Sequence, residues 1–129
     1  MSTPATSSAA IRAIDALLEL LASSGIEATR DAGAFYPQPV GVLVGLPTLT
    51  GRLLAAGGAT FTVPVLVVSG DPFNAELAVD RAYALADDVA IALRTDSYRP
   101  SSWRSSVNAE PLPAIELTVT VTTQEEASP

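Results

Sequence analysis

The last apolar segment of the chain, Ala114 to Thr123, constrains the fold more than any other part of the sequence. Four apolar residues alternate there with four polar ones: Ile115, Leu117, Val119 and Val121 with Glu116, Thr118, Thr120 and Thr122. Side chains of a β-strand point alternately to opposite faces, so this pattern predicts a strand with one buried and one polar face. The apolar face needs other elements packed on it, whereas the polar face tolerates water.

Two segments have the periodicity of amphipathic helices. The first runs from about Ala9 to Ser24, with Ser7 or Ser8 as its N-terminal cap and Gly25 as the left-handed residue that ends it. Its apolar residues recur at spacings of three and four: Ile11, Ile14, Leu17, Leu18 and Leu21.

The second helix is predicted from Asn74 to Arg94, with either Asp71 or Asn74 as its cap. One face carries mostly alanine, which lets a helix approach a sheet closely: Ala78, Ala82, Leu85, Ala86, Val89, Ala92 and Leu93. Asp80, Asp87 and Arg94 mark the opposite, solvated side.

Between the helices the sequence predicts strands. Ile26 to Asp31 is a candidate short strand, Val40 to Leu46 alternates in the manner of a strand that Pro47 ends, and Ala59 to Ser69 is the longest strand candidate. The stretch from Thr48 to Ala56 is ambiguous, and Gly57-Gly58 indicates a turn. Pro64 cannot donate to a ladder and therefore predicts an edge position or a bulge.

After the second helix, Thr95 to Pro113 is expected to be irregular, with a short strand near Ser105 to Asn108. The elements together predict an α+β fold, a mostly antiparallel sheet with both helices on one face. We expect one domain over residues 9–123, a loose tail over residues 1–8 and a polar tail over residues 124–129.

Composition excludes several kinds of chemistry. The 129 residues include 14 acidic and 7 basic ones, for a formal charge of −7, and every basic residue is arginine. A chain with this net negative charge is a poor candidate for binding nucleic acid, because phosphates bind to basic patches. Cysteine and histidine are absent, so disulfides, thiolate chemistry and Ser–His catalysis are excluded. We expect no signal peptide and no membrane span.

The candidates for catalysis or ligation are weak, and we predict no enzyme, no cofactor and no metal. Ser69-Gly70-Asp71 precedes a helix but lacks the phosphate-loop pattern and its lysine. Adjacent residues of a helix point about 100° apart, so Asp87 and Asp88 do not converge. Asp80 and Asp87 lie two turns apart on a solvent face.

The aromatic and arginine cluster of Tyr98, Arg99, Trp103 and Arg104 has two interpretations of equal weight. Trp, Tyr and Arg are the residues that dominate protein–protein interfaces, which indicates a docking loop. Alternatively Trp103 caps the core and the arginines are solvated. Binding of single-stranded nucleic acid is a third hypothesis, disfavoured by the overall charge.

Thr118, Thr120 and Thr122 form the polar face of the last strand. Either this face is exposed to solvent, or it packs on another subunit with hydroxyls bonded across the seam.

Three segments in this order resemble the tail terminators of long-tailed phages, especially those that infect actinobacteria: Val40 to Pro47 (VGVLVGLP), Thr62 to Gly70 (TVPVLVVSG) and Leu112 to Val121 (LPAIELTVTV). With the N-terminal helix, the resemblance covers about residues 9 to 123.

The resemblance implies an α/β sandwich that assembles as a hexameric ring, caps the tail tube and meets the head connector. It implies self-association, a tail tube protein and a connector protein as partners, and a virion location after assembly in the host cytoplasm. DNA would pass through the lumen without specific binding, and no catalytic residue or cofactor is implied. The loop with Trp103 and the hairpin around Arg52 are our candidate contact surfaces.

Three alternatives stay open. Within the virion, the chain could be a head-completion or connector adaptor, or a tail-tube subunit. Outside it, the rivals are a cytoplasmic module that binds a small ligand or a peptide, and a small enzyme whose acidic residues converge in a cleft.

Overall fold

The computed structural model describes residues 8–33, 35, 37, 40–53, 58–70, 75–104 and 111–123. It confirms the α+β class, because two helices accompany a six-stranded, mostly antiparallel sheet. The elements follow one another as α1 (Ala9–Ser23), β1 (Ala28–Thr29), β2 (Val40–Val44), β3 (Thr48–Leu53), β4 (Gly58–Ser69), α2 (Ala75–Leu93), β5 (Tyr98–Trp103) and β6 (Leu112–Thr123).

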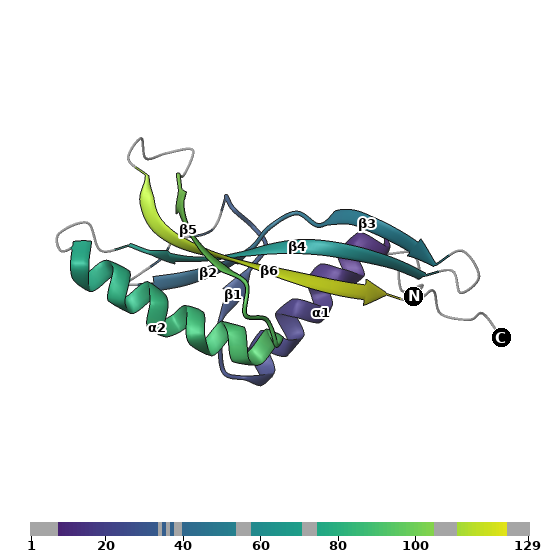
Figure 1. Ribbon diagram of the computed structural model, residues 1–129, viewed down its shortest axis with the longest axis horizontal. Coiled ribbons are helices and arrows are strands. Elements are labelled where there is room, and N and C mark those ends of the chain that lie inside the picture. Colours follow the sequence, from purple (N-terminus) through teal and green to yellow (C-terminus); the bar gives the residue numbers. More distant parts are fainter. Residues whose placement is uncertain are drawn as a thin grey trace.

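The sheet is built around the two longest strands, β4 and β6, which pair antiparallel from Ala59↔Thr123 to Val68↔Ala114. The strand order is β1-β2-β4-β6-β5, and β3 pairs with β4 beyond the end of β2. Within the described strands, β1 and β2 form the one parallel pair. Figure 1 shows β3, β4 and β6 running together as a three-stranded arm toward the end where α1 begins.

Both helices lie on the same face of the sheet, as predicted (Figure 1). Val63, Val65, Val67 and Leu117 on that face are fully buried. The helices contribute one apolar stripe each to the same core: Ala13, Ile14, Leu17 and Leu21 from α1, and Ala82, Ala86, Val89 and Leu93 from α2. The small alanine side chains of α2 let its backbone lie close to the valine-rich sheet.

The predicted ends of α1 are confirmed. Ser8 has extended backbone angles and its hydroxyl accepts a hydrogen bond from the amide of Ile11 at 3.2 Å. Gly25 follows the helix with φ 77°, in the left-handed region that glycine adopts without a Cβ clash. Asp71 and Asn74, the two predicted caps of α2, lie outside the described residues.

Of the edge or bulge predicted from Pro64, the edge position is wrong, because β4 is paired on both sides. The strand opposite is irregular there, since residues 45–47 lie opposite residues 63–64. Pro64 lies opposite Thr118 of β6, and its carbonyl accepts from the amide of Gly45 at 2.8 Å on the other side of the strand. A residue's N–H and C=O point to the same side, so the missing donor also faces that side. There the neighbouring strand is interrupted between Val44 and Thr48, and the β4–β6 ladder loses no bond.

The irregular stretch predicted from Thr95 to Pro113 is also wrong. It contains β5, which pairs with β6 from Tyr98↔Leu117 to Trp103↔Leu112, and β6 itself starts at Leu112 rather than Ala114. The sequence YRPSSW lacks an apolar alternation because β5 is an edge strand that the helices cover little. The short strand predicted near Ser105 to Asn108 lies outside the described residues.

Gly70 at the end of β4 provides a test of the close packing beside the sheet. A Cβ at Gly70 would collide with the carbonyl oxygen of Pro37. We expect Gly70→Ala to lower the free energy of unfolding by about 1–3 kcal/mol, measured by urea denaturation. Gly51→Ala is the matched control, since the nearest heavy atom to its Cβ is 3.9 Å away. Equal stabilities of the two variants would contradict this packing.

Candidate functional site

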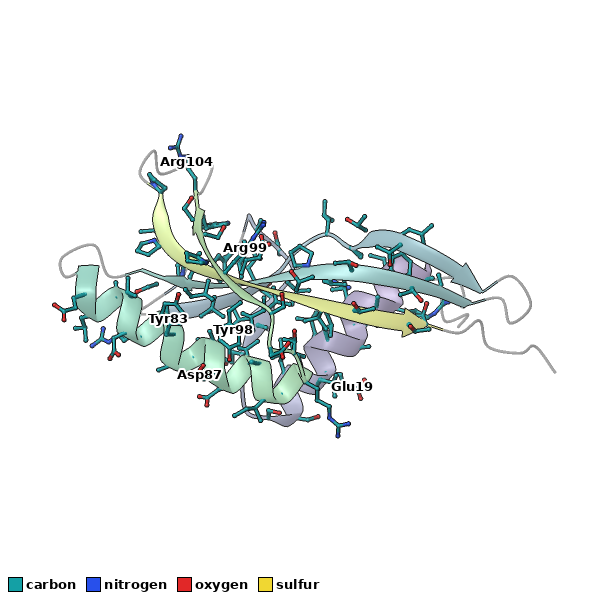
Figure 2. The ribbon with its side chains drawn as sticks, viewed as in Figure 1. Glu19, Tyr83, Asp87, Tyr98, Arg99 and Arg104 are labelled. Atoms are coloured by element: carbon teal, nitrogen blue, oxygen red, sulfur yellow. The ribbon has the colours of Figure 1, made fainter. Side chains whose placement is uncertain are left out.

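The aromatic and arginine cluster lies on strand β5 and not in a loop. Because β5 alternates, its side chains divide between the two faces of the sheet. Tyr98 is paired with the buried Leu117 and lies on the helix side, whereas Arg99 is paired with Glu116 on the opposite, open side. Figure 2 shows Tyr98 beside α2 and Arg99 on the other side of the strand. The sequence cluster is therefore not a single surface.

Tyr98 ties the edge strand to α2. Its half-buried side chain donates a hydrogen bond to Oδ1 of Asp87 at 3.0 Å. Burial raises the pKa of Tyr98 above its ordinary value of 10.0, and the hydrogen bond to Asp87 and the charges of Asp87 and Asp96 raise the pKa further. Asp87, expected on a solvated helix face, is exposed and serves as this acceptor.

Arg99 forms an ion pair across the ladder. Its Nη2 lies 2.9 Å from Oε2 of Glu116, and the side chains are 72% and 19% exposed, respectively. A pair this exposed contributes about 0–1 kcal/mol, so it orients the two side chains more than it stabilises the fold. Arg104, immediately after β5, is exposed (Figure 2).

Trp103 packs against another aromatic residue on the open side of the sheet. Its ring meets Phe35 edge-on, with centroids 5.0 Å apart and planes at 87°. Phe35 lies over Gly41 of β2, where a Cβ would be 2.8 Å from the ring. The contact thus joins the β2 side of the sheet to β5 across the open face, and this end of the face has a small apolar cover.

The far end of the open face carries threonines. Thr60 and Thr62 of β4 lie directly opposite Thr122 and Thr120 of β6, with Thr118 next in line opposite Pro64. We call this set, Thr60, Thr62, Thr118, Thr120 and Thr122, the threonine face. Thr60 and Thr122 share a hydrogen bond at 3.2 Å between their hydroxyl oxygens. The face is uncharged, and Thr120 and Thr122 are exposed.

Arg52, the remaining predicted contact residue, belongs to β3, where it pairs with Ala59 next to the last pair before the β3–β4 turn. Its side chain lies outside the described part of the structure.

Of the weak catalytic candidates, the structure describes Ser69, Gly70, Asp80, Asp87 and Asp88. Ser69 is fully buried at the end of β4, and the backbone of Pro37 lies against Gly70. Asp71 is not described. Asp80 and Asp88 are exposed on α2. Within the described ranges, no three acidic side chains are grouped in a way that could hold a metal ion.

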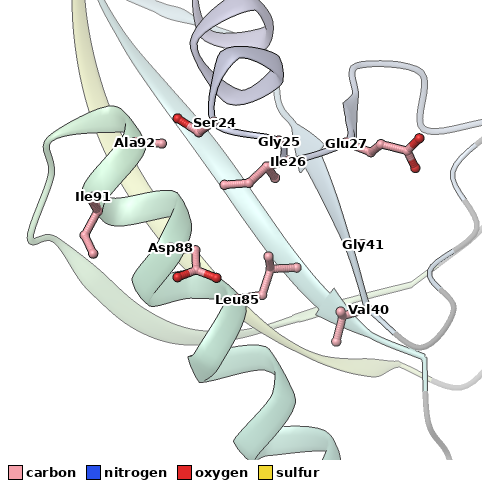
Figure 3. Close-up of a pocket in the computed structure, with 10 residues that line it drawn as sticks. All are labelled: Ser24, Gly25, Ile26, Glu27, Val40, Gly41, Leu85, Asp88, Ile91 and Ala92. Carbon is pink, nitrogen blue, oxygen red and sulfur yellow. The ribbon is translucent and has the colours of Figure 1, made fainter.

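A groove that the sequence did not indicate lies between the C-terminal end of α1, β2 and α2 (Figure 3). Its volume is about 820 Å³, and Ile26, Val40, Leu85 and Ile91 line it together with the carboxylate of Asp88. Ile91 is 78% exposed although it belongs to a helix with a well-buried apolar face. Ile91, an apolar residue outside the buried face of α2, is the one feature of the sequence that could have indicated the groove. The groove itself could not be predicted, because three separate elements build it.

No described helix is long and apolar enough to cross a membrane. No protein-family model matches the chain, and no curated protein matches its sequence.

The Tyr98–Asp87 contact predicts a loss of stability in alkali. Since the folded-state pKa of Tyr98 is raised, its contribution is fully present below the ordinary pKa of 10.0 and is lost as the pH rises through the folded-state pKa. We expect Tyr98→Phe to remove this part of the pH dependence in urea denaturation as the pH rises above 10.0. Asp87→Asn should lower the pKa of Tyr98 only part of the way, because burial remains, which NMR of ¹³C-labelled tyrosine measures.

The Trp103–Phe35 contact predicts an energetic coupling. A double-mutant cycle of Trp103→Ala and Phe35→Ala should give about 0.5–1.5 kcal/mol by urea denaturation, the range for edge-to-face aromatic pairs. The matched cycle of Trp103→Ala with Tyr83→Ala, an exposed aromatic on α2, should give none. If Trp103 serves docking alone, its replacement would leave stability unchanged and weaken assembly.

Proposed function

We propose that this chain is a structural subunit of a ring, and specifically a phage tail terminator that caps the tail tube and joins it to the head connector. Such a ring needs a heterologous contact, in which one patch of a subunit meets a different patch of the next. The threonine face is one of these two patches. It is uncharged and carries hydroxyls from two paired strands, so it suits packing on another protein surface more than holding a small substrate.

The arrangement of the three segments that resemble terminators also supports the proposal. They coincide with β2, β4 and β6, which are adjacent in the sheet. The resemblance therefore falls on one continuous structural unit, the centre of the sheet. A net charge of −7 also suits a ring through which DNA must slide, because like charges keep the DNA from sticking.

A tail-tube subunit and a connector adaptor are neighbouring candidates. A binding module for a small ligand or a peptide is the rival from another class, and the groove beside Leu85 and Ile91 is the observation that favours it. Apolar walls with a few polar groups are typical of ligand sites.

Electron microscopy and light scattering of the purified chain, alone and with tail tubes, distinguish these functions. The terminator predicts single rings that bind one end of a tube. Long tubes of this chain would indicate a tube subunit, and a monomer at every concentration, with tubes present as well, would indicate a binding module.

A charge on the threonine face should prevent ring formation. We expect Thr62→Lys, on the central strand, to abolish rings because the buried ammonium would lack a partner. Asp80→Lys, on the exposed side of α2, is the control and should leave the rings intact. Rings that survive Thr62→Lys would exclude this face as the contact.

A further inference from the structure

The described strands leave several edges of the sheet, and three of them carry features that hinder pairing. β5 carries Pro100 in the middle of its outer edge. β3 has a register irregularity between Leu49 and Gly51. β1 has only two residues. Proline, bulges and short length are the devices by which proteins keep sheet edges from adding strands.

The end of β6 has an edge without these features. β5 covers β6 only as far as Leu117, so no strand in the described part of the chain lies beside Val119 to Thr123 on that side. This segment has no charge, no proline and no register shift against β4. Valine and threonine also have high β-propensity. An edge of this composition is a template for another strand.

The direction of the backbone groups follows from the bonds around Thr118. Its amide donates to the carbonyl of Ser97 at 3.3 Å, and its carbonyl accepts from Oγ1 of Thr95 at 2.8 Å, both away from β4. Because hydrogen-bonding direction alternates along a strand, Thr120 and Thr122 also point their N–H and C=O outward. In the described part of the chain these two donors and two acceptors have no protein partner.

We propose that the outer edge of β6 pairs antiparallel with the same edge of a second copy of this chain, about a two-fold axis at Val121. Thr120 then lies opposite Thr122 of the second copy, and Thr122 opposite its Thr120, with four N–H···O bonds between them. Val121 faces its own counterpart in a pair without hydrogen bonds. The hydroxyls of the threonine face continue across the seam.

A second copy is favoured over other partners because the edge is self-complementary. Among the described edges, the end of β6 offers an outward row without charge, proline or register shift, so pairing β6 with β6 joins two such rows. The absence of charge also lets two chains of net charge −7 meet here without opposing like charges across the ladder.

The register is limited by β5. Ser97 and Thr95 occupy the outward groups of Thr118, so a second strand cannot extend past that point. Centring the axis on Val121 uses all four free groups of Thr120 and Thr122 and leaves those of Thr118 in place.

This contact goes beyond the proposed ring. An isologous contact closes after two copies, whereas a ring needs a heterologous one. The dimer is therefore expected whether or not the chain forms rings, and it buries few side chains, so the association is weak and is best trapped covalently.

Disulfide trapping of the full chain tests the register. The chain has no cysteine, so Val121→Cys introduces the only thiol. Antiparallel pairs without hydrogen bonds place Cα atoms about 4.5 Å apart, within the range that a disulfide spans. We expect Val121→Cys to form a covalent dimer under mild oxidation roughly ten-fold faster than Ser102→Cys, an exposed control on the β5 edge.

A second substitution separates pairing from collision. Thr122→Pro, added to Val121→Cys, removes two of the four bonds in the dimer while leaving the β4–β6 ladder intact, as Pro64 does in β4. Cross-linking should slow roughly ten-fold. Hydrogen exchange confirms that the variant is folded through protection of the β4 amides.

Three results would overturn the proposal: equal rates for Val121→Cys and Ser102→Cys, cross-linking unaffected by Thr122→Pro, or protection of the Thr120 and Thr122 amides from exchange in a strictly monomeric sample. The last result would show that another segment of the same chain covers the edge. Covalent dimers without rings would support the β6 contact and contradict the proposed ring. Rings without covalent dimers would support the ring and contradict the β6 contact.

Discussion

The antiparallel ladder between β4 and β6 is the interaction on which the rest of this structure depends. β4 precedes α2 in the chain and β6 follows it, so their pairing closes the largest part of the fold into one sheet. The ladder aligns Val63, Val65 and Val67 with Val119, Leu117 and Ile115 on one face. Both helices then have a single continuous apolar surface on which to pack.

The same ladder determines what the opposite face presents. Side chains alternate along each strand. The residue that follows or precedes a valine facing the helices therefore points to the open face. Toward β5 these neighbours are Leu66, Val68 and Ala114 together with Glu116, the ion-pair partner of Arg99, and Phe35 and Trp103 pack against each other on this side. Toward the arm they are threonines. The open face is thus divided into an end with an aromatic contact and an ion pair, and an end that carries hydroxyls, where Thr120 and Thr122 are exposed.

The two proposals use different parts of this arrangement. The ring uses the threonine side chains as a surface, whereas the dimer uses the backbone groups of Thr120 and Thr122 at the strand edge. Both arise because β6 is longer than β5, its neighbour on the outer side. A sheet whose outer strand ended level with β6 would have neither a free edge nor an arm bordered by open strands.

The sequence by itself determined the helices, the long strands and the choice of buried faces. The spacing of Leu17 and Leu21 and the alternation from Ile115 to Val121 are local patterns. They show which face of each element must be buried, whichever other element packs against that face. The placement of Pro64 and of β5 depends on the folded sheet. Pro64 sits in a central strand because its missing donor faces an interruption of the neighbouring strand, and Tyr98 to Trp103 form a strand because β6 offers them a ladder. Both outcomes depend on which strand lies next to these residues in the sheet. That neighbour is distant in the sequence, and pairing with it does not produce a periodic pattern of apolar residues.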